Sequence, residues 1–81
     1  MKKIIDGRKL NIIGEKVKEA RIKANLSQAE LSAKLELLPV YICRGSISRI
    51  ENGDRMINDI EIDGLSKVLN VPLDYLFSRE N

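Results

Sequence analysis

The sequence contains no histidine and no tryptophan, and its 81 residues include one cysteine, two prolines and three aromatic residues. A single cysteine, Cys43, excludes an internal disulfide and a cysteine-based zinc site. The absence of histidine removes the commonest acid–base side chain. No glycine-rich loop of the kind that cradles phosphates is present. We therefore expect a protein that is not an enzyme and that has no metal and no cofactor.

Long apolar runs are also missing. None approaches the ~20 residues that a helix needs to span a bilayer. The N-terminus lacks the apolar core of a secretory signal peptide, so we expect a cytoplasmic protein without membrane contact. A chain of 81 residues makes one domain. It has no room for a separate sensing domain, so we expect no small-molecule effector.

Charge is distributed unevenly along the chain. The net charge is only +2, but residues 1–34 carry nine Lys/Arg against four Asp/Glu, whereas residues 56–81 carry two against five. A basic first half suits contact with the phosphates of a nucleic acid. The same pattern also fits solvated helix faces, so charge alone does not decide.

Apolar spacing and capping signals predict five helices and no strand. Ser27 and Glu30 have the spacing of a capping box, and Asn58 and Glu61 repeat it. Asn25 and Gly53 fall where helices would need left-handed stops, Asn70 should stop the fourth helix, and Pro39 should end the second helix. The predicted helices cover residues 12–24, 27–38, 44–52, 58–69 and 73–77.

Four helices have an apolar stripe that predicts the core. The expected inward residues are Ile13, Val17, Ala20, Ala24, Leu31, Leu35, Leu38, Ile47, Ile50, Ile62, Leu65 and Leu69. Gly64 should allow close packing of the fourth helix on a neighbour. The apolar residues of the last helix, Leu73, Leu76 and Phe77, fit either the core or a dimer contact.

The third helix has two different faces. Ile47 and Ile50 share the inward face. Arginine reads guanine edges well and serine suits any base, so the other face suits the major groove of DNA. With the helix before it, this segment makes a helix-turn-helix hypothesis, in which Gln28 lies at a helix N-terminus suited to phosphate. The outward residues are Arg44, Gly45, Ser46, Ser48 and Arg49.

Four motifs in this order resemble the lambda-repressor/Cro-like helix-turn-helix domains, also called the xenobiotic-response-element family. They are Leu26–Leu31 (LSQAEL), Ile47–Gly53 (ISRIENG), Leu65–Val71 (LSKVLNV) and Leu73–Phe77 (LDYLF). The resemblance covers residues 12–77. It implies a compact all-α, five-helix DNA-binding domain, between a basic arm at 1–11 and a tail at 78–81, that binds operators as a homodimer.

The resemblance also implies roles for individual residues. It implies a structural ion pair between Arg21 and Glu51. The implied DNA contacts are a phosphate contact at Gln28, base or groove contacts from Arg44, Gly45, Ser46 and Arg49, and backbone contacts near Asn52 and Arg55.

One departure is the stretch between the second and third helices, which is longer than the family's usual turn. The extra residues either lengthen the second helix or enlarge the turn. We expect Tyr41 to pack against the protein. We expect Cys43 to cap the third helix or fill space, since nothing nearby in the sequence clearly activates its thiolate.

The function expected from the sequence is sequence-specific binding of double-stranded DNA by a transcriptional regulator, a repressor. One alternative is an antitoxin-like or adaptor module whose main partner is a protein. An RNA-binding domain is another, disfavoured because aromatic residues for base stacking are scarce. The basic arm fits either a minor-groove contact or a frayed terminus.

Overall fold

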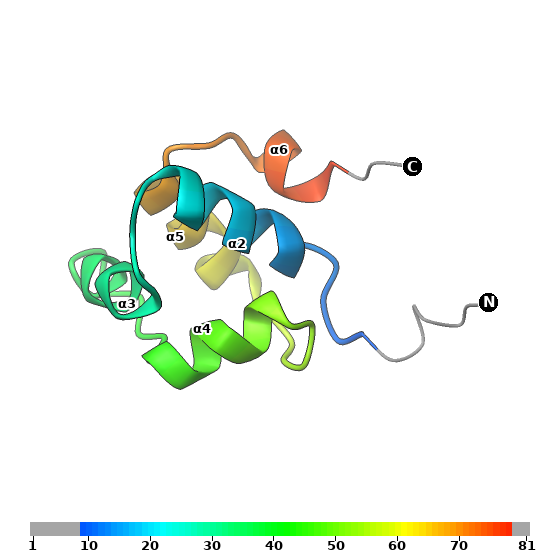
Figure 1. The fold of residues 1–81 in the computed structure, drawn as a ribbon, viewed down its shortest axis with the longest axis horizontal. Helices are drawn as coiled ribbons and strands as arrows, with labels where there is room; N and C mark the ends of the chain where they lie inside the picture. The colour runs from blue at the N-terminus through cyan, green and yellow to red at the C-terminus, as the bar shows by residue number, and fades with distance from the viewer. Residues whose placement is uncertain (1–8, 79–81) are drawn as a thin grey trace.

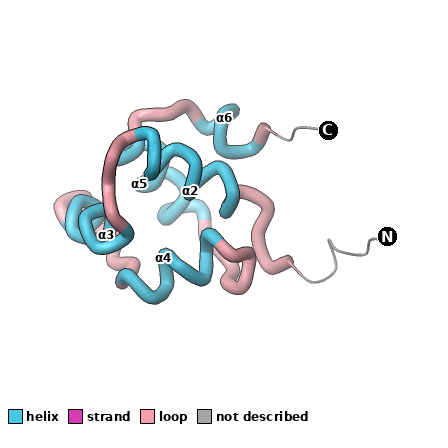
Figure 2. Tube along the Cα trace, viewed as in Figure 1, coloured by secondary structure: helices cyan, strands magenta, loops and turns pink. Residues whose placement is uncertain are grey.

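A computed structural model describes residues 9–78, and within them the chain forms five α-helices and no strand (Figures 1 and 2). The all-α, five-helix prediction is confirmed. Residues 1–8 of the expected arm and residues 79–81 of the expected tail lie outside the described residues. The helices are α2 (Gly14–Lys23), α3 (Gln28–Glu36), α4 (Arg44–Glu51), α5 (Asp59–Leu69) and α6 (Leu73–Phe77).

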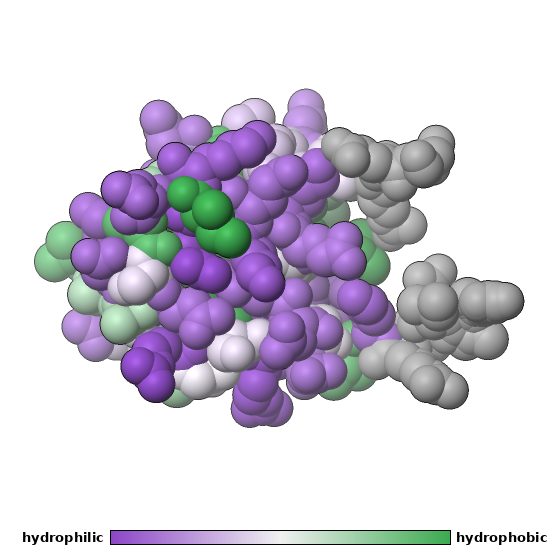
Figure 3. Space-filling view, in the orientation of Figure 1, coloured by the Kyte–Doolittle hydropathy of each residue, from purple (hydrophilic) through white to green (hydrophobic). Residues whose placement is uncertain are grey.

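Helix α4 lies at one edge of the molecule. It packs on α2 and α3, whereas α6 packs on α2 and α5 and lies at the opposite edge (Figure 1). No helix within residues 9–78 is long and apolar enough to cross a membrane. The face in Figure 3 is largely hydrophilic, with hydrophobic side chains in separate areas.

The helix boundaries follow from local capping. The Ser27 hydroxyl accepts from the Glu30 amide at 3.0 Å, and the Glu30 carboxylate accepts from the Ser27 amide at 2.7 Å. The same reciprocal pair joins Asn58 and Glu61 at the start of α5. The predicted left-handed stops are confirmed by positive φ values at Asn25 (62°) and Gly53 (81°). Asn70, where α5 was expected to stop, is also left-handed, with φ 57°.

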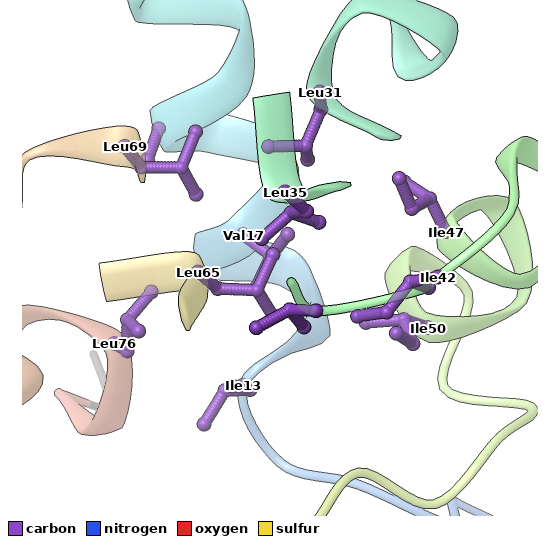
Figure 4. Packing of buried hydrophobic residues seen from close by; sticks show 12 residues of the cluster. Ile13, Val17, Leu31, Leu35, Ile42, Ile47, Ile50, Leu65, Leu69 and Leu76 are labelled. Carbon is purple, nitrogen blue, oxygen red and sulfur yellow. The ribbon is translucent and has the colours of Figure 1, made fainter. Parts of the chain in front are cut away.

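One hydrophobic cluster draws on all five helices, and its side chains turn toward a shared interior (Figure 4). Most predicted inward positions are buried, and Ile62 is half-buried. Two predictions are wrong. Ala24 is exposed because it caps the C-terminus of α2, where the chain already turns toward α3. Leu38 is 40% exposed because α3 ends before it.

The long connection between α3 and α4 is an enlarged turn, not an extension of α3. The helix ends at Glu36, because the amides of Leu37 and Leu38 turn back to carbonyls three residues earlier. Val40 and Ile42 then enter the core, at 7% and 2% exposure.

Tyr41 lies between these two buried residues, and the expectation that it packs is wrong. Its side chain is 73% exposed. Burial alternates along this segment, with Val40 and Ile42 in the core and Tyr41 between them outside it. Burial of Val40 and Ile42 therefore turns Tyr41 outward.

Two glycines permit close approaches between elements. A Cβ on Gly64 would lie 2.9 Å from Val40 Cγ2, which confirms that α5 packs closely on a neighbour. A Cβ on Gly14 would lie 2.1 Å from the Ile50 carbonyl oxygen. The start of α2 thus lies directly against the backbone of α4.

We predict that Gly14→Ala lowers the free energy of unfolding by about 3 kcal/mol, the upper end of the range for overpacking, because a backbone carbonyl must move. Urea denaturation measures the change.

The matched control for Gly14→Ala is Gly45→Ala, also in a helix, where nothing lies within 4 Å of the added Cβ. It should raise the free energy of unfolding by about 0.5–1 kcal/mol. Equal stability of the two variants would contradict the close contact at Gly14.

Candidate nucleic-acid interface

The eight residues of α4 divide between an inward and an outward face. Ile47, Ile50 and Glu51 are buried. At about 100° per residue, the other face spans about 140° around the helix axis. We call it the reading face. Its members are Arg44, Gly45, Ser48 and Arg49 of α4 and the C-cap residue Asn52, all exposed except the half-buried Ser48.

The two arginines of the reading face are available to a partner. Arg44 and Arg49 are exposed, and within residues 9–78 neither makes a hydrogen bond or an ion pair. Gly45 lies between them on the same face, with open space around its Cα. The reading face therefore presents two unpaired guanidinium groups, and between them the backbone at Gly45 is not covered by a side chain.

Ser46 lies at the edge of the reading face and contacts Cys43. The Cys43 thiol donates to the Ser46 hydroxyl at 3.4 Å, although no side-chain hydrogen bond caps the helix there. Hydrogen bonding with the Ser46 side chain, and then with backbone amides of Ser46 and Gly45, lowers the pKa of the Cys43 thiol. Cys43 occupies the N-cap position of α4, but its exposed side chain neither caps the helix through a hydrogen bond nor fills space in the core, as was expected of it.

The Glu51 carboxylate joins α4 to the two helices beneath it. Its side chain is 2% exposed and that of Arg21 is 11% exposed. Arg21 donates to both carboxylate oxygens, at 2.7 and 3.1 Å, and also to the Leu26 carbonyl at 2.9 Å. The hydrogen bonds that Arg21 donates to Glu51 raise the pKa of the Arg21 guanidinium. The structure thus brings the two residues of the implied ion pair together.

Gln28 is the third member of this network. Its amide donates to Glu51 at 3.0 Å, so its side chain lies along the protein rather than projecting freely. The second N–H and the carbonyl oxygen of the side chain have no partner within residues 9–78. Gln28 can therefore support Glu51 and still offer polar atoms at the start of α3.

Asn52 and Arg55 follow α4 but differ in availability. Asn52 is exposed. Arg55 makes two 3.0 Å hydrogen bonds to Glu61 and a third to the Met56 carbonyl. These bonds lower the pKa of the Glu61 carboxyl and largely neutralise the arginine within the protein.

Asn11 falls within the predicted arm at 1–11, but it connects distant parts of the domain. Its side chain bonds to the backbone of Ile13 and Gly14 and to the carbonyls of Ile50 and Arg55. An asparagine shortly before an apolar stripe is a common helix-start signal, and this signal could have indicated the first pair of bonds. The second pair joins segments distant in the sequence.

The helices α3 and α4, their turn and the exposed face of α4 have the arrangement of a helix-turn-helix. A model of the helix-turn-helix family matches residues 17–76. The chain belongs to this lambda-repressor/Cro-like helix-turn-helix family. No curated protein matches the chain at a significant level. Membership of this family makes the chain a DNA-binding transcription regulator. The proteins of the family are generally not enzymes.

We predict that Glu51→Ala destabilises the helix-turn-helix domain by ~3–5 kcal/mol, because the buried Arg21 guanidinium loses its partner. Thermal unfolding followed by circular dichroism measures the loss.

Asp63→Ala is the matched control for Glu51→Ala. It removes an exposed ion pair with Lys67, and exposed pairs contribute only about 0–1 kcal/mol. Equal melting temperatures for the two variants would show that the Glu51 pair does not hold the domain together.

Proposed function

We propose that this protein is a repressor that binds specific sequences of double-stranded DNA, with α4 in the major groove. The observation that carries the proposal is the reading face: two unpaired arginines around a glycine, on a helix anchored to its neighbours. Arginine can donate two hydrogen bonds to one guanine, which gives Arg44 and Arg49 the discriminating role.

The remaining residues supply position rather than sequence discrimination. Gln28 offers its free amide N–H to a phosphate at the N-terminus of α3, where backbone amides also favour an anion. Ser46 and Ser48 line the groove beside the arginines. Asn52 and the unbonded N–H groups of Arg55 approach the DNA backbone after the helix ends.

A homodimer is the assembly that we propose. Leu76 is buried, so of the two roles left open for α6 it belongs to the core. Leu73 and Phe77 are 47% and 44% exposed and are available for contact between copies. A symmetric dimer recognises two half-sites one helical turn apart, roughly 34 Å. We propose that the bound dimer represses by occupying its operator in the cytoplasm.

Selection of bound sequences from random DNA tests this function. We predict a palindromic motif with half-sites about one turn apart, and a loss of ~1–3 kcal/mol in specific binding for Arg44→Ala and for Arg49→Ala. Affinity for unrelated DNA should fall much less, because the lost contacts are to bases.

Lys67→Ala is the control for the arginine variants, since it removes an exposed cation from α5 and should leave the selected motif bound as before. Failure to enrich any sequence at low salt would contradict the proposal and favour an adaptor whose main partner is a protein. Equal losses on selected and unrelated DNA would assign the arginines to phosphates.

Gly45→Ala separates folding from DNA binding. The added methyl group meets no protein atom, so the domain should fold at least as well as the wild type. We predict that it nevertheless weakens specific DNA binding by about tenfold, because it keeps the α4 backbone from the groove. Fluorescence anisotropy measures the affinity for the selected DNA. An unchanged affinity would show that the α4 backbone at Gly45 does not approach the DNA closely.

A further inference from the structure

The side chain of Asn11 uses its full hydrogen-bonding capacity. Its amide nitrogen donates to the carbonyls of Ile50, at 3.0 Å, and Arg55, at 2.9 Å. Its oxygen accepts from the amides of Ile13, at 3.2 Å, and Gly14, at 2.8 Å. A primary amide has two N–H donors and two acceptor lone pairs, and all four are engaged. One side chain thus joins the start of α2, the last turn of α4 and the loop that follows α4.

The contact lies where the backbones of α2 and α4 come closest. The Ile50 carbonyl faces Gly14, where an added Cβ would lie 2.1 Å from the oxygen. This carbonyl is in the last turn of α4, where carbonyls lack the usual helical partner. It also accepts from the Gly53 amide at 3.0 Å. Asn11 supplies a second donor to it.

Two neighbouring residues strengthen this junction. The Leu10 amide donates to the Gly53 carbonyl at 2.8 Å. The Lys9 side chain covers Gly53, since a Cβ there would lie 2.9 Å from Lys9 Cδ. Residues 9–11 therefore lie across the C-terminal end of α4.

The hydrogen bonds of Asn11 (the Asn11 anchor) and the ion pair of Glu51 with Arg21 (the Glu51 anchor) both tie α4 to α2, but they meet α2 at different places. Glu51 binds Arg21, which lies seven positions after Gly14, or about 10 Å along the axis of α2. On α4 the two anchors act at adjacent residues, Ile50 and Glu51, and they tie this last turn to two different places on α2. A single tie lets the C-terminal end of α4 shift, whereas two ties to different places on α2 fix where that end lies. The second anchor also holds the Arg55 carbonyl and hence the loop at 52–58.

We infer that Asn11 is a positioning residue for DNA recognition, which fixes where the C-terminal end of α4 lies and sets the course of the 52–58 loop. The inference rests on the proposed DNA binding. Of the reading face, Arg49 lies within the anchored last turn of α4 and Asn52 follows that turn directly. When the anchor is lost, these groups meet the DNA in several orientations, which lowers discrimination between sequences more than affinity for DNA in general.

Asn11→Asp isolates the anchor. The substitution keeps an oxygen to accept from Ile13 and Gly14, and its charge suits the N-terminus of α2. It replaces the amide donor with a second oxygen facing the carbonyls of Ile50 and Arg55. Should the carboxylate prevent folding, Asn11→Ala removes the same donors without adding charge.

Hydrogen exchange of the DNA-free protein is the first measurement. In Asn11→Asp, the amides of residues 52–58 should exchange about threefold to tenfold faster, which is the effect of losing the one hydrogen bond to this loop, at the Arg55 carbonyl. The matched control is Ser66→Ala, which removes a hydrogen bond to the Val71 carbonyl at the far end of α5. It should leave exchange of the 52–58 loop unchanged. Exchange that stays at the wild-type rate in Asn11→Asp overturns the inference.

The ratio of affinities for selected and unrelated DNA is the second measurement, made where all variants are fully folded. We expect this ratio to fall about threefold to tenfold in Asn11→Asp and to stay constant in Ser66→Ala. Faster loop exchange with an unchanged ratio makes Asn11 merely structural and overturns the inference. If the wild type itself shows no preference for any DNA, the proposed function fails. Hydrogen exchange is measured without DNA, so its result tests the Asn11 anchor whether or not the proposed function holds.

Discussion

The buried carboxylate of Glu51 is the constraint on which the arrangement of the site depends. A charge that is 2% exposed is tolerated only where donors surround it, and here they come from Arg21 in α2 and Gln28 in α3. The last turn of α4 must therefore lie where these two helices meet. Because Glu51 lies on the inward face beside Ile47 and Ile50, placing this charge also turns the opposite face of α4 to solvent.

The same constraint explains how a helix of eight residues serves both the core and a partner. Its inward residues supply two apolar side chains and the buried charge, and its outward residues contribute almost nothing to the packing of the domain. Gly45 shows this division most clearly. A helix interior disfavours glycine, and no neighbouring atom requires its small size. Its presence is understandable if the space above it is filled by DNA.

What the sequence predicted well is local. Capping boxes at Ser27 and Asn58 and the left-handed stops depend on residues within one or two turns, so the pattern and the structure agree there. What it missed depends on distant partners. Val40 packs against Gly64, and this contact leaves the neighbouring Tyr41 exposed. Nothing near Tyr41 in the sequence indicates the contact between Val40 and Gly64. The pairing of Arg21 with Glu51 was available only through the family resemblance, and the two long-range bonds of Asn11 had no local signal.

The enlarged turn before α4 does not loosen the helix. The Ser32 hydroxyl donates to the Ile42 carbonyl at 2.7 Å, and the Val40 amide donates to the Leu35 carbonyl at 2.9 Å, so α3 holds the chain just before α4 begins. The C-terminal end is held by Glu51 and Asn11. The helix is thus fixed at both ends, and the extra residues change the surface beside it, where Tyr41 stands exposed. The enlarged turn therefore adds exposed surface at Tyr41, while Val40 and Ile42 keep the chain that leads into α4 fixed on α3.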